Sequence, residues 1–437
     1  MAERIVAVMN ERRVRGGREA NEVGALWEYR LCRLRFVQGF FVRRSIDVWP
    51  DGLQGNKLGE LDVVSTSFDP RLGTRTEVIE AKSGAGAKEI DRVMWLRGMA
   101  GYAGMDEATF AKVRVDPRVR AVARRLRANI LDEAAVAAAE RAAGIKPDDW
   151  VGFADPDLGE RVIKRARAHL TSSEPLRRAG KFLFGSFWFT DEFARINQLR
   201  TLADLLAEHH AEVDPAALTL ACSEVVSLTA VATLKITNWR GQYEPDEFRK
   251  FAAGQLSSGF GQQVGLRRVL QQVDSMTRDF VEGLHDDYTA AGVARISRRV
   301  PQLEYELLRV PEWAEAFMDL SARMQERAGI AMHVLRLLDL RAAERLGSRQ
   351  DTSKVRDSWA GQSRQVEDAA NLLEKFCVSV WGLPARGLQM ITRDVMVAKT
   401  DSSPSASEAG AEVTEGQHQL TFDDGERKTD ADPSESK

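Results

Sequence analysis

Residues 59–82, GELDVVSTSFDPRLGTRTEVIEAK, decide the fold of the N-terminal part of the chain. β-Branched residues are concentrated over 61–66 and again over 76–81, which is typical of strands. The segment between them, 69–73, contains aspartate, proline and glycine, which are turn formers. The sequence therefore predicts an antiparallel hairpin.

Three of the charged residues in this hairpin, Asp62, Glu80 and Lys82, bear on its chemistry. On a strand, the two-residue period puts Glu80 and Lys82 on one face and Ala81 on the other. Asp62 lies inside the apolar run of the partner strand, so the hairpin brings Asp62 beside Glu80. Two carboxylates with a lysine alongside are what a hard divalent cation, Mg²⁺ or Mn²⁺, and an attacking water require.

A different interpretation of the same residues stays open at this point. The segment 77–82 is also compatible with a helical turn that carries a Glu/Lys surface pair, with Asp62 simply ending a strand. The Ser-Gly-Ala-Gly that follows and the flanking β-branched residues favour the strand.

The sequence around the hairpin predicts an α/β unit. Upstream, 21–37 has helical apolar spacing and 40–48 reads as extended. Downstream, a β-α-β crossover is predicted, in which Asp116 and a proline open the second helix. The downstream elements are a helix over 88–102, a strand over 108–115, a helix over 117–127, a strand over 129–131 and a helix over 134–143.

The remainder of the 437 residues predicts helices and an acidic tail. We expect an α/β domain over 1–145, a linker over 146–157, a large all-α domain over 158–398 and a disordered tail over 399–437. Apolar stripes over 313–338 and 264–284 predict packed helix faces, or a dimer seam that would make the protein a homo-oligomer. The net charge of -3 excludes a uniformly basic nucleic-acid coat.

The cysteines and the most apolar segment bear on localisation. Cys32, Cys222 and Cys377 lie far apart without ligand spacing, so neither a disulfide framework nor a zinc site is encoded, and a cytoplasmic protein is expected. The segment 218–236 contains Glu224 near its centre, which favours a buried core helix over a membrane span.

Three motifs follow each other along the chain. They are Gly24-Ala25-Leu26-Trp27-Glu28 in the first helix, Gly59-Glu60-Leu61-Asp62-Val63-Val64 on one strand, and Glu80-Ala81-Lys82 on the next. In this order they resemble the PD-(D/E)xK nuclease superfamily, and within it the Mrr-like restriction endonuclease branch. The resemblance covers residues 18–143 and implies a restriction-endonuclease-like fold. It does not extend to the helical remainder.

The resemblance also implies roles for individual residues. Asp62 and Glu80 would bind the metal together with the carbonyl of Ala81. Lys82 would act on the attacking water, and Glu28 would be an accessory catalytic ligand. Glu60 stands where the superfamily's name has proline, a position at which many members vary.

The implied function is an Mg²⁺-dependent DNA endonuclease that hydrolyses phosphodiesters, with restriction or antiphage defence as its setting. A DNA-repair nuclease is the alternative. A rival from another class is a non-catalytic nucleic-acid-binding or scaffold protein that keeps a degenerate nuclease fold.

The two ends of the chain add two expectations. An N-terminal run of arginines predicts an arm on the DNA backbone, or a solvated terminus. In the tail, the spacing of Gln417, Leu420 and Phe422 resembles the peptides with which bacterial replication proteins dock on the sliding clamp. The arginines of the N-terminal run are Arg12, Arg13, Arg15 and Arg18.

Overall fold

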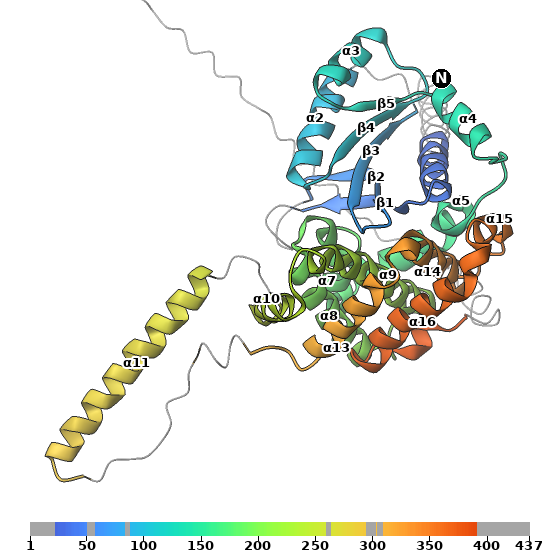
Figure 1. Cartoon of the computed structure of the whole chain (residues 1–437). Coiled ribbons are helices and arrows are strands. Elements are labelled where there is room, and N and C mark those ends of the chain that lie inside the picture. Colours follow the sequence, from blue (N-terminus) through green and yellow to red (C-terminus); the bar gives the residue numbers. More distant parts are fainter. Residues whose placement is uncertain are drawn as a thin grey trace, which may run out of the picture. The chain divides into compact units, whose positions relative to one another are not determined.

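The computed structural model describes residues 22–49, 57–83, 88–258, 264–293, 303 and 309–390. The N-terminal part contains a small mixed sheet with helices packed on it, and the rest of the described chain is helical (Figure 1). At this level the predicted order, an α/β region followed by a helical region, is confirmed.

The sheet has five strands in the order β1-β2-β3-β4-β5. β1 to β3 are antiparallel neighbours, whereas β3, β4 and β5 are parallel. The predicted hairpin and the predicted crossover are therefore confirmed, although the strand expected over 108–115 ends at Lys112. The strands are β1 (Phe41–Val48), β2 (Gly59–Phe68), β3 (Thr74–Lys82), β4 (Glu107–Lys112) and β5 (Asn129–Leu131).

Helices cover the sheet. The helix over 22–37 packs beside α4 (Glu133–Ala142), and α2 (Glu89–Tyr102) lies beside α3 (Pro117–Arg125), as Figure 1 shows. Glu140 of α4 accepts hydrogen bonds at 2.7 Å from both Arg30 and Arg33 of the first helix. These charge-assisted bonds hold the two helices together.

Helix α9 (Pro215–Arg240) forms the core of the helical region, since helices α6, α7, α8, α13, α14 and α16 pack around it. It is long and apolar enough to cross a membrane, but its most apolar window is entirely buried within the protein. The predicted core helix is confirmed, as expected for a helix that is apolar all round. The other helices are α5 (Pro156–Leu158), α6 (Lys164–Ser172), α7 (Glu174–Leu183), α8 (Glu192–His209), α10 (Pro245–Ser258), α11 (Val264–Ala290), α13 (Ala314–Gln325), α14 (Ala331–Arg345), α15 (Ser353–Asp357) and α16 (Ser363–Ser379).

The two apolar stripes have different outcomes. The stripe over 313–338 lies on α13 and α14, and its Phe317, Met324 and Val334 are buried, as predicted for packed faces. The stripe on α11 is exposed, with Met276 65% accessible, so it is not packed within the described chain, and the alternative, a dimer seam, stays a prediction there. Periodicity shows that a helix has an apolar side, but it does not show what covers that side.

One buried cluster joins β1 to the helices. The Arg43 guanidinium lies 2.9 Å from the Glu224 carboxylate of α9 and 2.8 Å from Asp339 of α14. Its carbon is 4.0 Å from the Phe41 ring centre and 4.6 Å from that of Phe153. Burial raises the pKa of both carboxyl groups, and the charge of Arg43 opposes that shift.

The segment expected as a linker is packed rather than exposed. Val151 and Asp155 are buried, and Trp150 stacks on the guanidinium of Arg33 at 4.2 Å. The Arg33 side chain also donates to the carbonyl of Pro147 at 2.6 Å. The domain boundary at 146–157 stays a prediction, but side chains from both sides of it share buried contacts.

The Arg43 cluster predicts a large loss of stability on mutation. Arg43→Met keeps an apolar side chain of similar length but leaves Glu224 and Asp339 buried without their cation. Because removing one partner of a buried ion pair costs about 3–5 kcal/mol, we expect the free energy of unfolding in urea to fall by that amount.

The matched control is Arg249→Met, since Arg249 pairs with Glu315 on the surface. An exposed pair contributes about 0–1 kcal/mol. Similar unfolding curves for the two variants would show that the buried cluster does not hold the sheet to the helices.

Candidate active site

β2 and β3 separate at the position of the two predicted carboxylates. Val63 pairs with Ile79, and the same register would next put Asp62 opposite Glu80. Instead the Asp62 carboxylate accepts the backbone N–H of Ala81 at 2.7 Å. The Asp62 side chain therefore replaces a backbone hydrogen bond between the strands, and β2 and β3 separate at this end of the hairpin.

The neighbouring strand is irregular at the same level. Ser45 of β1 lies between the pairs Arg44–Val63 and Ile46–Leu61, and its φ of 56° is left-handed. Arg167 of α6 donates to the Ser45 carbonyl at 2.7 Å. The helical region thus stabilises the strained backbone beside Asp62.

The structure brings the three predicted charges together. The Lys82 ammonium lies 3.1 Å from Asp62 Oδ2 and 2.9 Å from Glu80 Oε1. Arg92 of α2 lies 2.5 Å from the same Glu80 oxygen. The Glu80 side chain is 1% exposed, whereas Lys82 is 36% exposed and faces solvent in part.

The protonation states follow from these contacts. Burial raises the pKa of Glu80, Asp62 adds to the rise, and Lys82 and Arg92 oppose it. Burial acts to lower the pKa of Lys82, but the Asp62 and Glu80 charges outweigh it, so this pKa is raised. Lys82 is therefore a cation at neutral pH and serves as a hydrogen-bond donor rather than as a proton acceptor.

The Glu80 carboxylate has the environment of a cation ligand. Both of its oxygens are buried. Lys82 and Arg92 pair with Oε1, whereas Oε2 has no hydrogen-bond partner among the described residues. A buried carboxylate with unused lone pairs, beside a second carboxylate, is suited to Mg²⁺ or Mn²⁺.

Few protein ligands are available for such a cation. Within the described ranges no group of three or more His, Cys, Asp and Glu side chains is placed to hold a metal ion. Asp62, Glu80 and the Ala81 carbonyl would be its protein ligands. Mg²⁺ commonly binds through one or two carboxylates and keeps several waters, so this small donor set fits that ion.

Glu28 approaches the site from the helix over 22–37. It lies 3.1 Å from Arg44, whose guanidinium stacks on the Tyr29 ring at 4.0 Å. Burial raises the pKa of Glu28 to about 7, with a further rise from Asp62 and an opposing effect of Arg44. The structure therefore places Glu28 within the electrostatic reach of Asp62.

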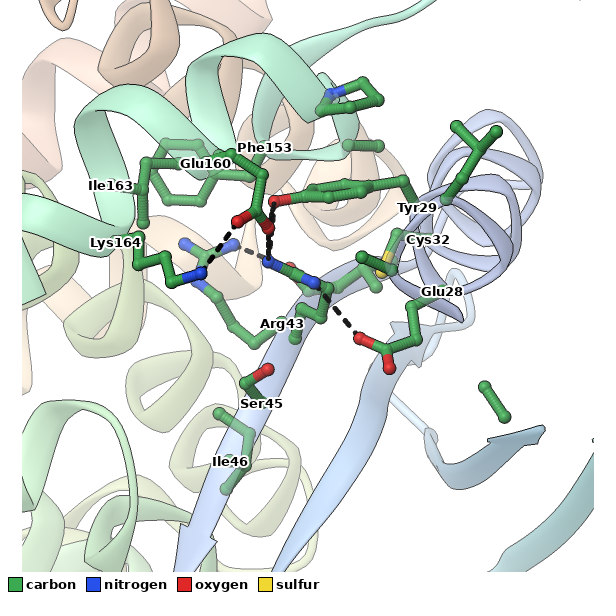
Figure 2. A pocket seen from close by; sticks show the side chains of 18 of the residues that line it. Glu28, Tyr29, Cys32, Arg43, Ser45, Ile46, Phe153, Glu160, Ile163 and Lys164 are labelled. Carbon is green, nitrogen blue, oxygen red and sulfur yellow. Dashed lines mark hydrogen bonds and ion pairs between the residues drawn. The ribbon is translucent and has the colours of Figure 1, made fainter. Parts of the chain in front are cut away.

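A cavity of about 1240 Å³ adjoins these groups. Glu28, Ala81 and Lys82 line it from the α/β region, and Lys164 and Arg167 line it from the helical region. Figure 2 shows the Glu28, Tyr29, Glu160 and Lys164 side chains around this cavity. The two regions together therefore form its wall.

A close contact supports this wall. Tyr29 Oη lies so near Gly159 that a Cβ atom there would approach it to 1.9 Å. Gly159 begins a single π-turn, Gly159–Ile163, which presents Glu160 to Arg44 at 2.9 Å. π-Turns inside helices frequently occur at functional sites.

Sequence reasoning missed a basic surface on α3. Six arginines between 113 and 127 are exposed, and only one acidic residue, Asp116, occurs in that stretch. Arg120 pairs with Asp132, while none of the other five has a carboxylate partner in the described chain. A count of arginines over 113–127 would have found the surface. The six are Arg114, Arg118, Arg120, Arg124, Arg125 and Arg127.

The basic surface begins at the same sheet edge as the carboxylates. Lys112 at the end of β4 pairs in register with Lys82 at the end of β3. β4 then leads through Arg114 into α3. An anionic polymer bound along α3 would therefore extend toward the candidate site.

Two groups of predicted functional residues lie outside the described part of the chain. They are the N-terminal Arg12, Arg13, Arg15 and Arg18, and the tail residues Gln417, Leu420 and Phe422.

Comparisons with protein-family models, with curated proteins and with solved structures find no match to this chain.

The raised pKa of Glu28 predicts a pH effect on stability in metal-free buffer. The folded-state pKa of about 7 lies above the ordinary 4.5, so the folded protein binds this proton more tightly. The resulting stabilisation is complete below pH 4.5 and is lost as pH rises through about 7. Glu28→Gln, which stays neutral, should therefore lose less stability between pH 5 and pH 8, by up to about 3 kcal/mol.

The measurement is the free energy of urea unfolding at the two pH values with EDTA present. Glu315→Gln is the matched control, because the Glu315 side chain is 71% exposed. Parallel pH profiles for Glu28→Gln and the unmodified protein would contradict the assignment of a buried, protonated carboxyl group.

Proposed function

We propose that this protein is an Mg²⁺-dependent DNA endonuclease whose α/β region has a restriction-endonuclease-like fold of the PD-(D/E)xK type. The observation that carries the proposal is the meeting of Asp62, Glu80 and Lys82 where β2 and β3 separate. Restriction or antiphage defence is the proposed setting.

Each residue of the cluster has a distinct chemical task. Asp62 and Glu80 would hold the cation, which supplies charge stabilisation at the phosphate and lowers the pKa of a bound water. Lys82 is a cation between both carboxylates, so its ammonium is suited to orient the attacking oxygen and to offset charge on the phosphate. Glu28, with a pKa of about 7, is suited to take up the proton that the water releases.

The charge distribution supports a nucleic-acid substrate. The exposed arginines that have no carboxylate partner in the described chain begin with Arg114, just beyond the sheet edge of the site, and continue along α3. Arginine and lysine neutralise backbone phosphates without reading sequence. The proposed path for DNA therefore runs along α3 to the carboxylates.

Substitution of the cluster tests the chemistry. Lys82→Ala and Asp62→Asn should each reduce Mg²⁺-dependent cleavage of plasmid DNA by at least about 10²-fold, because each removes a group that acts on the reacting atoms. Isothermal titration calorimetry should show weakened Mg²⁺ binding for Asp62→Asn. EDTA should stop cleavage by the unmodified protein.

Lys354→Ala is the matched control, since Lys354 pairs with Asp149 on the surface, and it should cleave normally. Undiminished cleavage by Lys82→Ala would refute the assigned roles. A protein that binds DNA but never cuts it would support the rival function, a non-catalytic nucleic-acid-binding protein.

The α3 surface gives a separate prediction on binding. Replacing Arg118, Arg124 and Arg125 together by alanine should weaken DNA binding at moderate salt in fluorescence anisotropy. Because each phosphate contact releases counterions, the slope of log K against log salt should fall by up to about 3. As a control, replacing Arg323 and Arg327 of the helical region should leave this slope unchanged. An unchanged slope for the α3 variant would exclude the α3 surface as a DNA-binding site.

A further inference from the structure

Helix α11 (Val264–Ala290) carries an apolar face that nothing in the described chain covers. It has 27 residues and is about 40 Å long at 1.5 Å per residue. The members of the face follow each other at spacings of three or four residues and are between 38% and 67% exposed. They are Val269, Val273, Met276, Phe280 and Leu284.

A helix of this composition needs a partner. Single helices in water are marginal, and most helical stability in proteins comes from packing of the apolar face. α11 contains Gly265, Gly283 and two β-branched valines in its face, all of which lower its intrinsic helix propensity. The exposed face is therefore a surface that association would cover.

The charge of α11 identifies the class of partner. The helix contains three arginines against five acidic residues, so it is not suited to nucleic acid or to an anionic membrane surface. Two of the three arginines, at 267 and 268, lie near its start, and two of the five acidic residues, Asp286 and Asp287, lie near its end. This polarity is complementary to the same helix in the reverse direction.

The spacing of the apolar face is also symmetric under reversal. About a point between Met276 and Thr277, Val269 maps onto Leu284 and Val273 maps onto Phe280. A two-fold interface requires that residue i contacts residue j and that j contacts i. An antiparallel pair of α11 helices meets this requirement, with Met276 of each copy next to the axis.

The flanking charges agree with the same arrangement. Reversal about the two-fold axis places the end of one copy that carries Arg268 alongside the end of the other that carries Asp286 and Asp287, and it aligns opposite helix dipoles. A parallel pair would instead bring both acidic ends together.

We infer that α11 is the dimerisation element of this protein and pairs antiparallel with α11 of a second copy. The inference does not depend on the proposed nuclease activity. The partner is a second copy because the spacing and the charges of the helix complement themselves.

The first test compares two glutamate variants of the full-length chain. Met276→Glu puts a charge at the axis of the pair, whereas Ser275→Glu puts the same charge one residue away on the opposite side of the helix. Analytical ultracentrifugation should show a dimer for the unmodified protein and for Ser275→Glu, and at least a tenfold weaker association for Met276→Glu. A monomeric parent protein, or a Met276→Glu dimer of normal affinity, would overturn the inference.

The second test determines the direction of the two helices by disulfide formation. Val269→Cys mixed with Leu284→Cys should cross-link under mild oxidation, while neither variant should cross-link with itself. Self-cross-linking of Val269→Cys would indicate a parallel pair and overturn the antiparallel assignment. The native Cys32, Cys222 and Cys377 are buried and do not compete.

Discussion

A buried guanidinium holds the sheet against the helices. Arg43 lies between two carboxylates of different helices, and the loss of any member would leave charge buried in a medium of low dielectric. Adjacent residues of a strand point to opposite faces, so Arg44 extends the other way, to Tyr29 and Glu28. In β1, Arg43 therefore binds the helical region, and the next residue, Arg44, positions Glu28 at the candidate site.

The candidate site depends on the separation of two strands. The pairing of β2 with β3 ends at Val63 and Ile79, one residue before Asp62 and Glu80. Beyond that pair, Asp62 accepts a backbone N–H, and the buried Glu80 relies on the charges of Lys82 and Arg92. The site thus contains a buried carboxylate oxygen without a hydrogen-bond partner and two carboxylates close together. An ion pair with only a structural role would require neither feature.

Local patterns in the sequence predicted most of the α/β region. The hairpin, the crossover and the meeting of Asp62, Glu80 and Lys82 follow from a period of two and from turn residues, which act over a few positions. The contacts of Arg43 with Glu224 and Asp339 were not predictable in this way, because partners far apart in the chain leave no local signal. The arginines of α3 are present in the sequence, but their exposure on one surface is a property of the tertiary structure.

The sequence by itself determined which segments become strands and helices, because hydrophobic period, turn formers and caps such as Asp116 are properties of neighbouring residues. It also determined that α9 is apolar all round and that α11 is apolar on one side. Only the tertiary structure decided that α9 is buried while the face of α11 is exposed, and that Glu28 lies near Asp62. Burial and electrostatic coupling depend on distances between distant segments, which composition and periodicity do not specify.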